Sequence, residues 1–330
     1  MAKEVRMSDI AQKLGISVVS VSKALSGKDG VGEEMRKRIL ETAEEMNYKK
    51  HTKSMNESGQ SINIGVLVAD RHFDENAFYS SLYRALINEC VAFDYNCILE
   101  IVSYEYEDNC TMPTFLVNNK VDALIFMGEL HSRYINAVLK CDLPYMLLDF
   151  YDDDIAGDSV LSDNTSGAYQ ITQNVLSSGI RNIAFVGSIL ATSSIMDRYL
   201  GYCRALLMEG IKIKSEWCLE DRDVEGKLIS IKLPEQMPEA FVCNCDETAF
   251  NLVELLKTKG YRVPEDISVT GYDDFRYSTI CRPALTSYRI DVKTMAKTVV
   301  KQLRRKMGGK SNLAPITIVP GELVLRDSVK

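Results

Sequence analysis

Residues 7–27, MSDIAQKLGISVVSVSKALSG, constrain the fold most strongly, because Ala11, Gly15 and Val21 have the spacing of a helix-turn-helix. Two short helices can cross closely where the first presents a side chain as small as Ala11. A sharp turn can follow at the glycine, which accepts a positive φ. Two amphipathic helices of an ordinary bundle could show the same spacing, so the rest of the chain has to distinguish the two structures.

The second helix of this motif is predicted to begin at Ser17, whose hydroxyl can cap a backbone amide. The N-terminal half of a recognition helix meets the base edges of DNA. The candidate DNA contacts on or beside that half are Ser17, Val18, Val19, Ser20, Ser22 and Lys23.

The distribution of charge supports a DNA-binding head. Residues 1–53 hold 11 Lys and Arg against 8 Asp and Glu, whereas the rest of the chain holds 28 against 38. A basic segment on an acidic body suits a head that contacts phosphates, although a solvated helix would also be rich in lysine. Residues 31–48 are predicted to form a third helix that completes a head of residues 1–48. The polar residues 49–61 are predicted to form a linker.

The body, residues 62–330, shows the alternation of strands and helices that is typical of an α/β fold. Its short apolar runs are those of strands buried on both faces of parallel sheets. The predicted strands are residues 64–69, 96–101, 123–127, 145–148, 183–186, 240–243 and 267–270. The helical patterns between them are residues 77–93, 167–178, 199–209 and 247–259.

The motifs that identify the chain extend over nearly its whole length: SVVSVSKAL and AEEMNY in the head, and INIGVLV, VDALIF, LPYMLLD, DRYLGYCRAL, VPEDISVTGYDD and GELVLRDS in the body. Together these segments resemble the lactose/galactose repressor family of bacterial transcription regulators. The resemblance implies a small all-α head and a body like a periplasmic binding protein, built from two doubly wound parallel-sheet subdomains. Ligand would bind in the cleft between them, at the carboxyl ends of strands. The implied subdomains are residues 62–158 with 285–312, and residues 159–284 with 313–330.

Candidate ligand contacts are charged and aromatic. Asp149 and Asp273 follow predicted strands, and Arg198 opens a predicted helix. Carboxylates and a guanidinium can bind vicinal hydroxyls, although each residue alone could be a structural ion pair or a helix cap. The resemblance implies that these three contact an effector and that Phe78 and Tyr79 stack on it, with a core role for that aromatic pair as the alternative.

Two positions depart from the family pattern. Cys245 stands where the family commonly has an asparagine that contacts the ligand, and a thiol is a weaker hydrogen-bond partner, so the identity of the effector stays open. The next residue, Asp246, is interpreted mainly as a helix N-cap. The linker lacks the Pro-Asn that typically precedes a hinge helix, and Met55 is the residue assigned as the wedge into the operator minor groove.

The remaining motifs do not favour an enzyme or a metal site. The three histidines lie in no metal-binding spacing, and no GxSxG, Walker or GxGxxG signature follows a strand. The nine cysteines are expected to be reduced thiols, and neither a cofactor nor a metal is expected. No run approaches the ~18 apolar residues of a membrane helix, and the first residues lack an apolar signal core. A cytoplasmic protein is therefore expected.

These features predict a homodimeric DNA-binding transcription regulator, a repressor whose affinity for operator DNA is controlled by a small molecule. A sugar or sugar derivative is the expected effector. The dimer is expected because a palindromic operator requires a twofold partner. The alternatives are a regulator that responds to a purine or to a phosphoprotein partner, and a solute-binding protein, which would need a signal peptide and no head.

Overall fold

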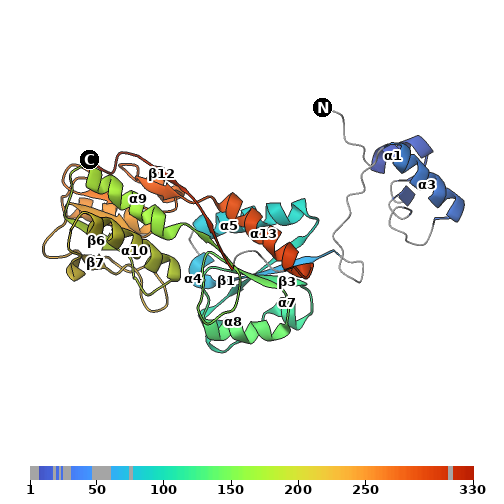
Figure 1. Cartoon of the computed structure of the whole chain (residues 1–330), viewed down its shortest axis with the longest axis horizontal. Coiled ribbons are helices and arrows are strands. Elements are labelled where there is room, and N and C mark those ends of the chain that lie inside the picture. Colours follow the sequence, from blue (N-terminus) through green and yellow to red (C-terminus); the bar gives the residue numbers. More distant parts are fainter. Residues whose placement is uncertain are drawn as a thin grey trace. The chain divides into compact units, whose positions relative to one another are not determined.

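The computed structural model describes residues 7–17, 20, 21, 24, 31–46, 61–73, 77–310 and 315–330. The chain divides into two compact units, Met1–Lys53 and Ser54–Lys330. Both are drawn in Figure 1.

The first unit contains the first and third predicted helices, α1 (Met7–Leu14) and α3 (Glu33–Glu45). Its buried core consists of Ile10, Ala11, Val21, Ala24, Ile39 and Ala43. Gly15 has a φ of 66°, as the predicted turn requires. The Ser17 hydroxyl accepts a 3.0 Å hydrogen bond from the backbone N–H of Ser20, which confirms the predicted capping role. The other predicted DNA contacts, Val18, Val19, Ser22, Lys23 and Met55, lie outside the described residues.

The second unit contains a six-stranded parallel sheet in the order β11-β5-β4-β3-β1-β2. Its strands are β1 (Asn63–Ala69), β2 (Asn96–Val102), β3 (Ala123–Met127), β4 (Tyr145–Leu148), β5 (Ser159–Ser162) and β11 (Ile316–Val319). The helices around it are α4 (Asp70–Phe73), α5 (Ala77–Ala92), α6 (Tyr104–Asp108), α7 (Thr114–Val117), α8 (Ser132–Val138) and α13 (Val292–Met307). This sheet and these helices are subdomain one.

Both faces of the subdomain one sheet are buried, because successive residues of a strand point to opposite sides. Ile125 of β3 belongs to the apolar cluster that contains residues of α5 and α13. Its neighbours Leu124 and Phe126 belong to a second cluster, which contains Phe115 of α7 and Tyr134 of α8. Helices on both faces confirm the doubly wound prediction.

A four-stranded parallel sheet in the order β7-β6-β8-β9 forms the centre of subdomain two. Its strands are β6 (Ile183–Val186), β7 (Cys218–Leu219), β8 (Ala240–Cys243) and β9 (Ser268–Thr270), and β10 (Ser287–Arg289) pairs antiparallel with β12 (Glu322–Val324) beside it. The helices are α9 (Asn164–Ser177), α10 (Ser193–Met208), α11 (Asp246–Thr258) and α12 (Arg276–Ile280). Helices α9 and α10 pack closely, and a Cβ at Gly201 would collide with the carbonyl oxygen of Thr165.

The chain crosses between the two subdomains three times, and each crossing follows the position expected from the resemblance. The strands β5 and β11 pair with each other and with β4 in subdomain one, so residues 159–162 and 316–319 do not belong to subdomain two. The second crossing along the chain follows β10, whose Arg289 bridges Asp273 in subdomain two. The apolar pattern of a short strand does not reveal which sheet it joins, because pairing is decided by partners distant in sequence.

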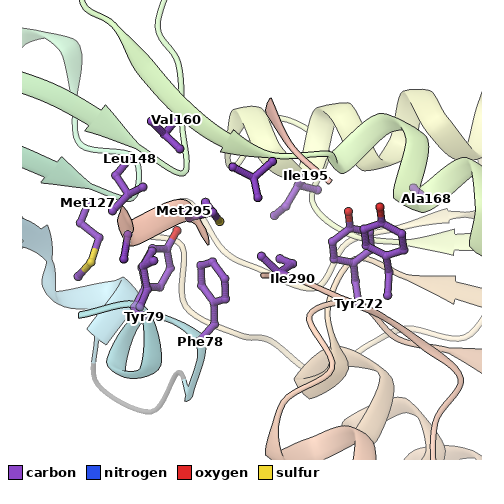
Figure 2. Close-up of a cluster of buried hydrophobic side chains, with 14 of the residues drawn as sticks. Phe78, Tyr79, Met127, Leu148, Val160, Ala168, Ile195, Tyr272, Ile290 and Met295 are labelled. Carbon is purple, nitrogen blue, oxygen red and sulfur yellow. The ribbon is translucent and has the colours of Figure 1, made fainter. Parts of the chain in front are cut away.

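One apolar cluster extends through both subdomains (Figure 2). Phe78 and Tyr79 lie beside Met127 of subdomain one, whereas Ile195 and Tyr272 come from subdomain two (Figure 2). The two subdomains therefore contact each other through this cluster, and this arrangement is called closed below.

Candidate ligand-binding cleft

A cavity of about 50 Å³ lies between the two subdomains. Its lining includes every residue predicted to contact an effector: Phe78, Tyr79, Asp149, Arg198, Cys245 and Asp273. The structure adds His72, Thr192, Ser194, Ile195, Arg222 and Asn244. Asp149 directly follows β4 in the sheet of subdomain one, whereas Asn244 directly follows β8 and Asp273 comes shortly after β9 in the sheet of subdomain two. The cavity therefore lies between the carboxyl ends of strands from two different sheets.

Asp149 presents a buried acceptor to this cavity from subdomain one. It follows β4 with a φ of 69°, and its Oδ2 accepts a 3.0 Å hydrogen bond from the hydroxyl of Tyr79 on α5. Its Oδ1 is buried and has no hydrogen-bond partner among the described residues. Burial raises the pKa of Asp149 to about 6, although Arg198 and the Tyr79 hydroxyl oppose the rise.

Arg198 is fixed by contacts on all sides of its guanidinium. From α10, its Nε donates to Asn164 Oδ1 over 2.8 Å and its Nη1 donates to the carbonyl oxygen of Asn244 over 2.7 Å. Its Nη2 lies 3.4 Å from Asp273 Oδ1, and its Cζ lies 4.0 Å from the centre of the Tyr272 ring. A ligand would therefore meet a preorganised cation.

Asp273 follows β9 and holds a φ of 101°, a conformation that few non-glycine residues adopt. Its backbone N–H donates to the carbonyl oxygen of Tyr288, which keeps the strained residue in place. Burial raises the pKa of Asp273 to about 7, and the Arg198 guanidinium opposes that rise. The predicted convergence of Asp149, Arg198 and Asp273 on one cavity is thus present in the geometry.

Cys245, and not Asp246, caps helix α11. The Cys245 Sγ accepts a hydrogen bond from the Thr248 N–H over 3.5 Å. Asp246 is the first helical residue, and its carboxylate accepts bonds from the Phe275 N–H (2.9 Å) and the Ser287 hydroxyl (2.6 Å). The interpretation of Asp246 as the N-cap was therefore wrong by one residue, and Asp246 instead fixes the segment that follows Asp273.

Arg222 is a cleft residue that the sequence analysis missed. Its Nη1 donates to Asp221 Oδ2 over 2.6 Å, and its Nη2 lies 3.8 Å from Cys245 Sγ. Asp221 Oδ2 also accepts bonds from the Asn244 amide and the Thr248 hydroxyl, each at 2.6 Å. Although burial opposes the change, Arg222 and these donors lower the pKa of Asp221. Neither residue lies in a periodic pattern, so only the contacts identify them.

The aromatic side chains of the cleft pack against one another. The Phe78 ring meets the rings of Tyr79 and Phe275 edge to face, with centroids 4.9 and 5.7 Å apart. His72, which the sequence analysis also missed, lies 5.1 Å from the Tyr79 ring, and burial lowers its pKa to about 3. Phe78 therefore belongs to the apolar core that joins the subdomains and lines the cavity at the same time.

A larger groove of about 1010 Å³ adjoins the cavity and shares Arg222 with it. Carboxylates dominate its charged lining: Glu129, Asp152, Glu220, Asp223 and Glu225. Within the described residues, no three His, Cys, Asp or Glu side chains are grouped to hold a metal, and all nine cysteines are free thiols. No helix of the described part combines the length and apolar character needed to cross a membrane.

Two family models match the chain. The model for bacterial regulatory proteins of the lacI family matches residues 6–51, and the model for a periplasmic binding protein-like domain matches residues 172–329. Catabolite control protein A of Priestia megaterium is 26% identical over 336 residues, with 99% of each chain covered. The HTH-type transcriptional regulator RegA of Clostridium saccharobutylicum is 27% identical over 330 residues, with 98% of each chain covered.

Solved structures share the fold. The lac repressor dimer bound to operator and the anti-inducer ONPF has a TM-score of 0.71 at 22% identity, with 99% of each chain covered. The complex of the transcriptional regulator CelR with cellobiose also has a TM-score of 0.71, at 18% identity, with 98% of this chain and 100% of that chain covered. With a helix-turn-helix head, a two-subdomain body and full-length likeness to transcription regulators, this chain belongs to the LacI family of bacterial regulatory proteins and is a DNA-binding transcription regulator.

Proposed function

We propose that the cleft of the body binds a sugar or sugar derivative and that this effector controls the affinity of the head for operator DNA. The observation that carries the proposal is the unpartnered Oδ1 of Asp149, a buried acceptor at the cavity. A buried acceptor without a partner costs about 1–3 kcal/mol, which a hydroxyl donor on a ligand would recover.

The residues around Asp149 suit a ligand with several hydroxyls. Arg198 and Asp273 offer a donor and an acceptor 3.4 Å apart, which matches the pairwise recognition of adjacent hydroxyl groups. Two relatives carry names that fit this reading: the ribose operon repressor of Haemophilus influenzae, and the CelR–cellobiose complex. A repressor named PurR in Glaesserella parasuis keeps a purine as the competing effector class.

Control of DNA binding would pass through the three segments, after β5, β10 and β11, that cross between the subdomains. A ligand that changes the closure of the cleft alters the relative orientation of the subdomains, and a homodimer would convert that change into the spacing of its two heads. We assign sequence reading and operator contact to residues of the head and linker: Ser17, Val18, Val19, Ser20, Ser22, Lys23 and Met55.

A thermal-shift screen of the full chain tests the ligand class. Monosaccharides, sugar phosphates and nucleobases are added separately to the wild type and to the Asp149→Asn and Glu254→Gln variants. The control residue Glu254 pairs with Lys257 on the exposed surface of α11, outside the cleft. A ligand at 100 times its Kd should stabilise the wild type and the control by about 2.7 kcal/mol.

We expect a sugar to stabilise the wild type and the control, and Asp149→Asn to weaken its effect by at least about tenfold in Kd. Stabilisation by a nucleobase and by no sugar would overturn the proposed ligand class. Equal sugar affinity in wild type and Asp149→Asn would remove Asp149 from the site.

A further inference from the structure

A carboxylate from subdomain one contacts the beginning of a helix in subdomain two. Glu129 lies between β3 and α8, and its Oε2 accepts a 2.7 Å hydrogen bond from the backbone N–H of Ser193, the first residue of α10. The first amides of a helix lack partners within the helix, and its N-terminal end carries a partial positive charge. Glu129 therefore stabilises α10 from across the cleft, while Thr192 caps the same helix locally through the Ile195 N–H.

A second contact from subdomain one reaches the same part of α10. The hydroxyl of Tyr151, in the segment after β4, donates to Asp197 Oδ1 over 3.3 Å. The residues of α10 and its cap that line the cavity are Thr192, Ser194, Ile195 and Arg198. The two contacts thus hold the part of the helix that faces the ligand site.

Glu129 is itself held firmly within subdomain one. The guanidinium of Arg71 donates to the carbonyl oxygen of Glu129 over 2.9 Å and forms an ion pair with the buried carboxylate of Glu107. The ring Nε2 of His72 lies 2.9 Å from the same carbonyl oxygen. Burial raises the pKa of Glu129, and the hydrogen bond from Ser193 opposes the rise, so the bond across the cleft favours the ionised carboxylate.

We propose that Glu129 is a positioning residue for the ligand site, which favours the closed cleft by capping α10 from the opposite subdomain. Opening of the cleft separates Glu129 from Ser193, so this hydrogen bond stabilises only the closed arrangement. By the same reasoning, a ligand that requires the closed cleft binds more tightly to a chain that retains the cap. This consequence for affinity rests on the proposed function, whereas the effect on closure does not.

The thiol of Cys245 reports on closure without any ligand. It lines the cavity and is 6% exposed, so alkylation by iodoacetamide requires the cleft to open. Cys281 is fully buried in the separate apolar cluster around α11 and serves as the internal reference within each sample. The measured quantity is the alkylation rate of Cys245 divided by that of Cys281, obtained by mass spectrometry of the full chain at one pH.

Two single variants remove the same hydrogen bond from its two ends. Glu129→Ala removes the acceptor, and Ser193→Pro removes the donor. Proline is tolerated in the first position of a helix, and Thr192, with φ −151° and ψ 155°, already has the extended conformation that precedes proline. Each variant should raise the rate ratio by about tenfold or more, the factor expected for a lost hydrogen bond to a charged group. Glu129→Gln keeps an acceptor oxygen and should give an intermediate ratio.

The double variant of Glu129→Ala with Ser193→Pro and a matched control, Glu100→Ala, test whether the effect comes from this one hydrogen bond. Glu100 accepts bonds from the N–H groups of Thr114 (2.6 Å) and Phe115 (3.2 Å), so it caps α7 entirely within subdomain one. Glu100→Ala should leave the ratio unchanged, and Ser193→Pro should add nothing in the Glu129→Ala background. The proposal is overturned by an unchanged ratio in Glu129→Ala, or by additive effects in the double variant. If the ratio rises as expected while the affinity for a sugar found by screening stays constant, closure by Glu129 stands and the proposed ligand role of the cleft fails.

Discussion

The Tyr79 hydroxyl and the Asp149 carboxylate form a buried 3.0 Å hydrogen bond at the cavity between the subdomains. Tyr79 lies on α5, whereas Asp149 follows β4, a strand that begins at Tyr145, 66 residues after Tyr79. Because only one carboxylate oxygen is satisfied, this pair combines a structural contact with an acceptor that remains available to a ligand.

Replacement of Tyr79 by Phe should destabilise the body by about 1–3 kcal/mol, because both oxygens of a buried carboxylate then lack a donor. Tyr106→Phe is the matched control, since the Tyr106 side chain is 47% exposed on α6. Urea unfolding measures both variants. If Tyr79→Phe loses no more unfolding free energy than Tyr106→Phe, the buried hydrogen bond between Tyr79 and Asp149 contributes little to stability.

Asp149 should make stability fall as pH rises toward neutrality. Its pKa is raised from 3.8 to about 6, so the folded protein binds the proton more tightly than the unfolded chain. The stabilisation is complete below pH 3.8 and is lost as pH rises through about 6. The stability of Asp149→Asn relative to wild type should therefore increase by up to about 3 kcal/mol between pH 4 and 7, measured by urea unfolding at each pH. If the difference in unfolding free energy between Asp149→Asn and wild type does not change with pH, the raised pKa of Asp149 is contradicted.

Arg198→Ala should destabilise the protein far more than Asp273→Asn. The alanine variant leaves the buried Asp273 carboxylate and the Asn164 side chain without the guanidinium, at a cost of about 3–5 kcal/mol. Because asparagine at position 273 keeps an acceptor for Arg198, Asp273→Asn should lower the free energy of unfolding by only about 1–2 kcal/mol. Thermal unfolding compares the variants with Glu254→Gln. Both cleft variants should also abolish the response of operator binding to effector, and a retained response in Asp273→Asn would exclude Asp273 as a contact.

Lys23 is predicted to read a base or a phosphate of the operator. If it donates to a guanine, Lys23→Ala should cost about 1–3 kcal/mol, concentrated at one operator position. A binding assay over all single-base variants of the operator measures this cost. Lys13→Ala removes a cation that pairs with Glu45 on the exposed surface of the head and serves as the control. An equal loss on every sequence would identify Lys23 as a phosphate contact.

Local sequence determined the elements of this protein and the chemistry available at their ends. Buried runs such as residues 123–127 and 240–243 became strands with the predicted bounds, because burial on both faces of a parallel sheet leaves a continuous apolar signature. Asp149 and Asp273 could be assigned to one cleft because each follows a parallel strand, and the resemblance implies that the carboxyl ends of strands from both subdomains face that cleft. The helix-turn-helix was recognisable because its turn and crossing require small residues at fixed positions.

Only the tertiary structure decided which loops meet and which strands pair. Glu129 and Ser193 are 64 residues apart, and nothing in either segment indicates that a carboxylate will cap a helix of the other subdomain. Arg222 likewise belongs to the cleft because its loop returns to Cys245, and β5 belongs to subdomain one because β4 and β11 flank it. Apolar periodicity is a local property that survives in the sequence. Hydrogen bonds between loops depend on the final packing of distant segments, and they leave no periodic trace.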